Sequence, residues 1–106
     1  MTKKPRPRTE RREAARAKEK LAHARERLAR LEAGGSAERP IPLESASQVE
    51  VHAGSLRCAR CDAAVRIDEH LARTVGDQPL RLVRLGCPRC GARRDAWFRL
   101  ERKLPS

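Results

Sequence analysis

The sequence is poor in aromatic residues, because it has no tyrosine and only one tryptophan, Trp97, and one phenylalanine, Phe98. A chain of 106 residues with so few large side chains can build only a marginal hydrophobic core. An additional cross-link, such as a structural metal ion or a disulfide, is therefore expected. No apolar run approaches the roughly 18 residues that a membrane span needs, and the N-terminus has no apolar leader segment. We therefore expect a soluble, cytoplasmic protein that does not bind membranes.

Four cysteines can supply that cross-link. They form two pairs, Cys58-Ala-Arg-Cys61 and Cys87-Pro-Arg-Cys90, and 25 residues lie between the pairs. This spacing predicts one metal site with four thiolate ligands, since two intervening residues let a tight turn aim both sulfurs of a pair at one ion. Pro88 adds a fixed φ and Gly91 allows a positive φ in the second turn. Four protein ligands leave no position for a substrate, so we expect one structural zinc ion.

Other uses of the cysteines and histidines are less well supported. Two disulfides would need an oxidising compartment, and a redox-active C-x-x-C motif usually adjoins a βαβ pattern, which is absent here. His23, His52 and His70 are scattered, and no nucleophile-histidine-acid set or carboxylate pair is evident. We expect no enzymatic activity and no small-molecule substrate. A switch in which oxidation ejects the metal stays open.

The N-terminal third of the chain is strongly basic. Residues 1–8 combine lysine and arginine with two prolines, which predicts a disordered basic arm. Residues 9–33 are nearly all strong helix formers, with Thr9 as a possible N-cap and two glycines after the end, which predicts a basic helix. The glycine, serine and proline residues in 34–47 predict a flexible linker. The helix should then move independently of the metal module, unless Ile41 and Leu43 dock onto that module.

The predicted helix also carries a narrow apolar seam. Its members fall at a and d positions of successive heptads: Ala14, Ala17, Leu21, Ala24, Leu28 and Leu31. The seam is thin where alanine fills it, and the flanking charges of a parallel dimer would be mixed. Self-association through this helix, or pairing with a helix of another protein, therefore stays open.

Residues 48–104 are predicted to form a β-module around the metal site. Val49 and Val51 alternate with polar residues, which predicts a short strand before the first cysteine pair. Further strands are expected at 63–75, with a possible helical turn near Asp68, at 80–85, with a possible bulge at Leu82-Val83, and at 96–104. In the last strand Phe98 and Trp97 lie on opposite faces, and only one face can dominate the core.

The order of cysteine knuckle, hairpin, knuckle and strand resembles the plan of the zinc ribbons. Cys58, Cys61, Cys87 and Cys90 correspond to their four ligands, and Cys87-Pro-Arg-Cys90-Gly91 is the most specific part of the resemblance. The resemblance covers residues 48–104 and implies a small metal-stapled β fold, a three-stranded antiparallel sheet. Zinc ribbons serve in transcription factors, RNA polymerase subunits, ribosomal proteins and protein-binding modules, so the resemblance implies a scaffold and not a task.

The cysteine pattern is also similar to that of rubredoxins, which bind iron in four thiolates and transfer electrons. Rubredoxins usually have an acidic chain, an aromatic core and a glycine after each knuckle. Here Asp62 follows Cys61, aromatic residues are nearly missing and the formal net charge is +11. Zinc is therefore expected in preference to iron.

The excess positive charge is typical of proteins with polyanionic partners, such as nucleic acid or an acidic membrane surface, and of these two we expect nucleic acid. The candidate nucleic-acid contacts are Arg11, Arg12, Arg16, Arg57, Arg60, Arg89, Arg93, Arg94, Trp97 and Arg99. Metal binding would gather the arginines that flank the cysteines, and Trp97 would either stack on a base or be buried over the sheet. A GC-rich coding sequence would also enrich arginine without any selection for binding.

Two functions follow from this pattern. The first is an accessory protein that binds nucleic acid, or a ribonucleoprotein or transcription assembly, through basic surfaces. The alternative is a protein-interaction adaptor that uses the metal module and the helical seam. The sequence does not distinguish DNA from RNA.

Overall fold

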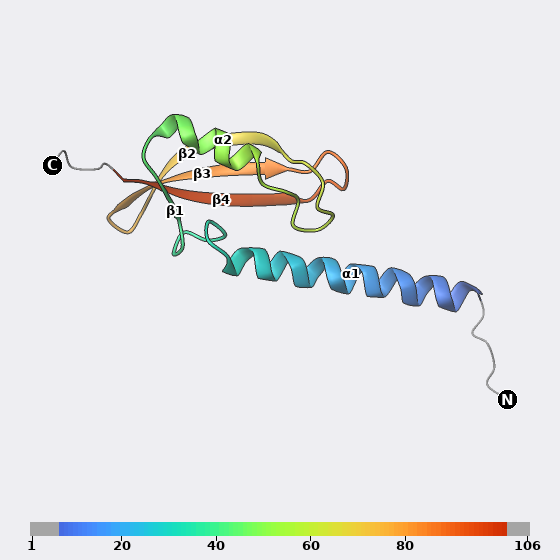
Figure 1. Ribbon diagram of the computed structural model, residues 1–106. Coiled ribbons are helices and arrows are strands. Elements are labelled where there is room, and N and C mark those ends of the chain that lie inside the picture. The colour runs from blue at the N-terminus through green and yellow to red at the C-terminus, as the bar shows by residue number, and fades with distance from the viewer. Residues whose placement is uncertain (1–6, 102–106) are drawn as a thin grey trace.

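The computed structural model describes residues 7–101 as a small sheet domain with a long helix beside it (Figure 1). Its elements in chain order are α1 (Pro7–Leu31), β1 (Ile41–Leu43), α2 (Ala46–Gly54), β2 (Arg66–Val75), β3 (Gln78–Gly86) and β4 (Arg93–Leu100). The basic arm expected at 1–8 lies mostly outside the described residues, as does the end of the last expected strand. Neither described helix has the length and apolar character needed to cross a membrane.

The four strands form one mixed sheet in the order β1-β4-β3-β2. Strands β2, β3 and β4 are antiparallel neighbours, whereas β1 runs parallel to β4 and pairs Ile41 with Phe98 and Leu43 with Leu100. The expected three-stranded antiparallel sheet is therefore extended by a fourth, parallel strand. Ile41 and Leu43 form this strand because both pack against the hydrophobic core.

The prediction of a flexible linker at 34–47 is wrong for this segment, because β1 and the start of α2 lie within it. Two backbone hydrogen bonds also hold the start of this segment, one to β4 and one within the segment. The N–H of Trp97 donates to the carbonyl of Gly34 at 2.8 Å, and the N–H of Gly34 donates to the carbonyl of Arg39. The prolines and glycines that looked like linker residues instead shape a turn and a short edge strand.

The strand predicted around Val49 and Val51 is also wrong, because these residues lie in α2. Gln48, three residues after the N-cap Ser45, turns back so that its side-chain oxygen accepts the Ser45 N–H at 3.2 Å, as in a capping box. Val49 and Ala53 are four residues apart and both buried, whereas Val51 is 77% exposed. The helical period therefore outweighs the two-residue alternation.

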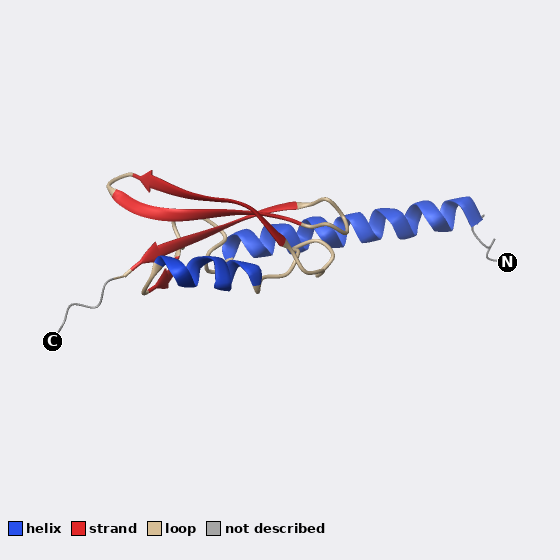
Figure 2. Ribbon diagram, turned by 90° about the horizontal axis from the view of Figure 1, so that it is seen from above, coloured by secondary structure: helices blue, strands red, loops and turns tan. Residues whose placement is uncertain are grey.

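The core lies between α2 and one face of the sheet (Figure 2). Val49 and Ala53 of α2 pack there with four strand residues, Val83, Leu85, Ala96 and Phe98. Phe98 is fully buried, so its face of β4 is the one that forms the core. Trp97 points to the opposite face and is only partly buried.

Strand β2 runs through Asp68 without the helical turn that was considered there. The register with β3 shifts between Ile67 and Glu69, so the irregularity is in β2 and not at Leu82-Val83, where a bulge was expected. Leu82 and Val83 are adjacent yet both buried in the inner strand β3, where Leu82 lies opposite Trp97 and Val83 lies opposite Ala96 of β4.

Helix α1 confirms the predicted N-terminal helix, begins at Pro7 and contains no buried residue. Glu19, Ala22, Glu26 and Ala29 fall on the side that faces the rest of the protein, and the last three are half-exposed. Leu21, Leu28 and Leu31 are 54%, 58% and 62% exposed. At about 100° per residue, Leu21 and Leu31 lie about 130–150° around the helix from the side that carries Glu19 and Glu26. Leu28 instead borders a pocket that Cys58 and Arg94 also line.

Substitution of Gly34 should test how the segment after α1 is held. Gly34 has a φ of +84°, and a Cβ there would lie 2.6 Å from Cδ1 of Ile41. We expect Gly34→Ala to lower the free energy of unfolding by about 1–2 kcal/mol, measured by urea denaturation of the full chain. Gly54→Ala is the matched control, because no atom lies within 4 Å of its added Cβ. An equal loss in both variants would contradict a specific role for Gly34.

Candidate metal centre and basic groove

Each cysteine pair lies in a tight turn, and the two turns have the same backbone hydrogen bonds. In the first, the N–H of Cys58 donates to Ala63 at 2.8 Å and the N–H of Asp62 donates to the carbonyl of Cys58 at 2.9 Å. In the second, Cys87 donates to Ala92 and Gly91 donates to Cys87, both at 2.9 Å. The two knuckles are therefore local repeats that meet at one end of the sheet.

A residue with positive φ closes each knuckle. Gly91 has a φ of +78°, and Asp62, at the equivalent position, has a φ of +61°. Asp62 is the only residue other than glycine with positive φ in the described chain. Aspartate tolerates this region better than most residues, so the first knuckle keeps its shape although it lacks the glycine of the resembled families.

The four cysteine sulfurs converge, since all of them lie within 4.8 Å of one another. Sγ of Cys58 is 3.5 Å from Sγ of Cys90, and Sγ of Cys61 is 3.5 Å from Sγ of Cys87. These separations far exceed the roughly 2.05 Å of a disulfide and approach the roughly 3.8 Å of two ligands on a tetrahedral ion with bonds of about 2.3 Å. The cluster can therefore hold a metal ion, as in a zinc-ribbon-like site.

The electrostatics of the cluster also favour a cation. The N–H of Cys90 donates to Sγ of Cys87 at 3.4 Å and, with the N–H of Arg89, lowers the pKa of Cys87 to about 6. The N–H of Ala92 lowers the pKa of Cys90, but burial and hydrogen bonds with the other three sulfurs outweigh it and raise that pKa to about 12. Four adjacent thiols thus resist full ionisation unless a cation balances their charge.

Arg60 connects the first knuckle to α1. Its Nη2 donates to both carboxylate oxygens of Glu19 at 2.6 Å, and its Nε lies 3.3 Å from Oε1 of Glu26. The hydrogen bond with Arg60 lowers the pKa of Glu19 below its ordinary value. Arg39 adds a second connection, donating from Nη1 to the carbonyl of Leu31 at 2.6 Å. These contacts place the C-terminal half of α1 beside the sheet domain.

The ten predicted nucleic-acid contacts fall in three places. Arg11, Arg12 and Arg16 lie on the exposed N-terminal half of α1, and four others, Arg57, Arg60, Arg89 and Arg93, lie beside the knuckles. Arg94, Trp97 and Arg99 lie along β4. Several of these arginines already have partners within the chain: Arg57 approaches Asp62, Arg60 binds Glu19, Arg94 donates to the Arg57 carbonyl and Arg99 pairs with Glu101.

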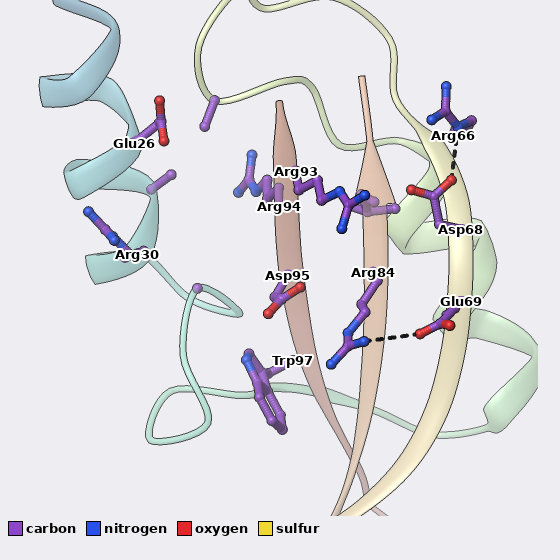
Figure 3. Close-up of a pocket in the computed structure, with 14 residues that line it drawn as sticks. Glu26, Arg30, Arg66, Asp68, Glu69, Arg84, Arg93, Arg94, Asp95 and Trp97 are labelled. Atoms are coloured by element: carbon purple, nitrogen blue, oxygen red, sulfur yellow. Dashed lines mark hydrogen bonds and ion pairs between the residues drawn. The ribbon is translucent and has the colours of Figure 1, made fainter. Parts of the chain in front are cut away.

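A groove of about 900 Å³ lies between α1 and the sheet face that α2 leaves uncovered (Figure 3). Arg93, Arg94 and Trp97 are the predicted residues that line it. The predicted contacts did not include Arg30 on α1, Arg66 on β2 and Arg84 on β3, which line the same groove. Arg84 is two residues after Leu82 in β3, so the sequence could have indicated that both lie on one face of the sheet. Only the folded structure shows that α1 lies opposite this face.

Comparison with known proteins gives no family assignment. The chain matches no family model, no curated protein and no solved structure. The assignment of a function therefore depends on the geometry of the cysteine cluster, of α1 and of the groove.

The cysteine cluster predicts proton release on zinc binding. Zinc binds thiolates, and the raised pKa of Cys90 means that its thiol is protonated at neutral pH before metal binds. We expect zinc to bind one per chain, to release protons and to bind less tightly at about pH 6 than at about pH 8. Titration in weak buffer with an indicator, and competition with a chelator at both pH values, would measure this. Equal affinity at the two pH values would contradict thiolate ligation, and Cys90→Ser should weaken binding.

The Arg60 contacts predict that this side chain holds the middle of α1 beside the first knuckle, whereas Arg39 holds its C-terminal end. We expect Arg60→Ala to leave the cysteine cluster intact but to increase the motion of α1, because the contacts of Arg60 with Glu19 and Glu26 are lost. Backbone ¹⁵N relaxation would show this as faster effective tumbling of α1 amides relative to sheet amides. Arg89→Ala is the matched control, since it occupies the same place in the second knuckle and pairs with no carboxylate among residues 7–101.

Proposed function

We propose that this protein binds one structural zinc ion through Cys58, Cys61, Cys87 and Cys90, as a zinc ribbon does, and acts as an accessory protein of a nucleic-acid or ribonucleoprotein assembly in the cytoplasm. Zinc suits the site because four thiolates satisfy its tetrahedral coordination and leave no open position. The observation that carries the proposal is the arrangement of α1. A long basic helix with no buried residue extends past the knuckle end of the sheet, where further arginines gather (Figure 1).

An exposed basic helix of this kind is suited to a phosphate backbone. Arg11, Arg12 and Arg16 lie in the half of α1 beyond the Arg60 contacts, and none pairs with a carboxylate among the described residues. Each phosphate contact releases counterions and gains free energy without reading sequence. Arg89, exposed in the second knuckle, adds positive charge at the same end of the sheet. The partner is therefore proposed as RNA, DNA or an assembly that contains either.

No catalytic step belongs to this proposal. The candidate acid-base groups have structural surroundings: His52 packs edge-on against Phe98 with ring centroids 5.5 Å apart, and Nδ1 of His70 lies 3.3 Å from Glu50. A zinc ion with four cysteine ligands has no position for a reactive water.

A protein-interaction adaptor is the second candidate, and one observation favours it. Leu21, Leu28 and Leu31 are each more than half exposed, and Leu21 and Leu31 lie on the side of α1 away from its contacts with Arg60. Another helix could cover this seam without displacing the Arg60 contacts. In this function the zinc module and α1 would each hold a different protein.

Salt-dependent binding distinguishes the two functions. We expect zinc-loaded full-length protein to bind labelled RNA or duplex DNA in fluorescence anisotropy, with affinity that falls steeply as salt rises. Substitution of Arg11, Arg12 and Arg16 by glutamine should reduce the slope of log affinity against log salt by about 2–3. Replacement by lysine is the matched control and should preserve the slope.

The leucine seam provides the contrasting variant. Substitution of Leu21, Leu28 and Leu31 by alanine should leave nucleic-acid affinity unchanged if the proposal is right. Absence of binding at low salt by the unmodified protein would overturn it. Loss of function in the leucine variant alone would support the adaptor.

A further inference from the structure

The groove beside α1 has positive charge that the protein itself does not neutralise. Two of its arginines are paired, Arg66 with Asp68 at 2.8 Å and Arg84 with Glu69 at 3.2 Å. Its Glu26 is engaged by Arg60. No described carboxylate lies within ion-pair distance of the other three arginines, Arg30, Arg93 and Arg94. Arg94 already donates to the Arg57 carbonyl at 2.8 Å. An anionic ligand would therefore find the guanidinium groups of Arg93 on the sheet wall and Arg30 on the α1 wall without a carboxylate partner.

Trp97 and Asp95 lie next to each other on the sheet wall of this groove (Figure 3). They are two residues apart in β4, so they share a face with about 7 Å between their Cα atoms. Trp97 is half-buried, and Asp95 forms no ion pair within the described residues. A planar ring stacked on the indole would place its polar edge beside the Asp95 carboxylate.

We infer that this groove binds single-stranded nucleic acid, with one unpaired base stacked on Trp97 and its amino group donating to Asp95. Arg93 on the sheet and Arg30 on α1 hold the flanking phosphates. The inference rests on the proposed function and narrows it to unpaired strands and to bases that carry an exocyclic amino group. Uracil has no exocyclic amino group, and its one base donor, the N3–H, lies between two carbonyl oxygens that the Asp95 carboxylate would repel, so it forms the weaker complex.

The dimensions of the groove support a single strand over a duplex. A volume of about 900 Å³ is in the range of pockets that hold small organic ligands and can accept a nucleotide. A duplex hides its base faces in the stack, so its bases cannot reach Trp97 without being flipped out. The wall that α1 contributes depends on Arg60, so the groove is complete only when the first knuckle is folded.

The single tryptophan makes the groove directly observable. Because the chain has one tryptophan and no tyrosine, its intrinsic fluorescence reports on Trp97 alone. We would titrate the zinc-loaded full-length chain with RNA oligomers of about eight cytidines or eight uridines, and with duplex RNA. Both single strands should quench Trp97, the cytidine oligomer should bind more tightly, and duplex should quench little.

Three variants test the assigned roles by anisotropy. Trp97→Leu should weaken single-strand binding roughly 5- to 150-fold, whereas Trp97→Phe should retain most of it. Asp95→Ala should abolish the preference for cytidine over uridine. Arg93→Gln should weaken binding more than Arg73→Gln, which removes the same charge from an exposed site outside the groove.

The outcomes separate this inference from the proposed function. Binding in anisotropy that neither quenches Trp97 nor responds to Trp97→Leu would overturn the groove assignment and leave nucleic-acid binding intact. Stronger binding of duplex than of single strands would also overturn it. No binding of any oligomer at low salt would overturn both.

Discussion

Convergence of four cysteine sulfurs at one end of the sheet is the constraint on which the remaining structure depends. The buried core is small, with Phe98 as its only aromatic residue from the sheet, so burial alone holds the strands together weakly. A metal ion held by both knuckles would join the chain before β2 to the connection between β3 and β4. It would also fix the knuckle that carries Arg60, which contacts α1. Binding of an ion would therefore contribute both to folding and to the position of the helix.

The parts of the structure that sequence predicted are those set by local chemistry. The spacing of Cys58, Cys61, Cys87 and Cys90 predicted the cluster because a C-x-x-C turn directs two sulfurs without help from distant residues. Helix α1 was predicted because its residues favour a helix with little tertiary support. The sequence showed only that Asp62 stands where the resembled families have a glycine. Its positive φ shows that the first knuckle keeps the same backbone geometry with aspartate at this position.

The parts that sequence did not predict depend on long-range pairing. Ile41 forms a parallel edge strand because Phe98, 57 positions later, offers an unpaired backbone edge and a core to pack on. The sequence around Val49 fits both a strand pattern and a helix pattern. It forms a helix because Gln48 makes the capping contact with Ser45 and because Val49 and Ala53 are buried on one helical face. The groove joins residues from α1, β2, β3 and β4, so no single stretch of sequence reveals it.

Charge distribution gives the two sides of α1 separate roles. The side with Glu19 and Glu26 is acidic and faces the basic knuckle, which explains why an otherwise basic helix lies beside an arginine-rich domain without repulsion. The opposite side presents leucines, and the N-terminal half presents arginines. Because the acidic contacts are confined to the C-terminal half, that half forms the wall of the groove while the other half projects. Arg30 in the half that lines the groove and Arg11, Arg12 and Arg16 in the projecting half then give one helix basic side chains at both places.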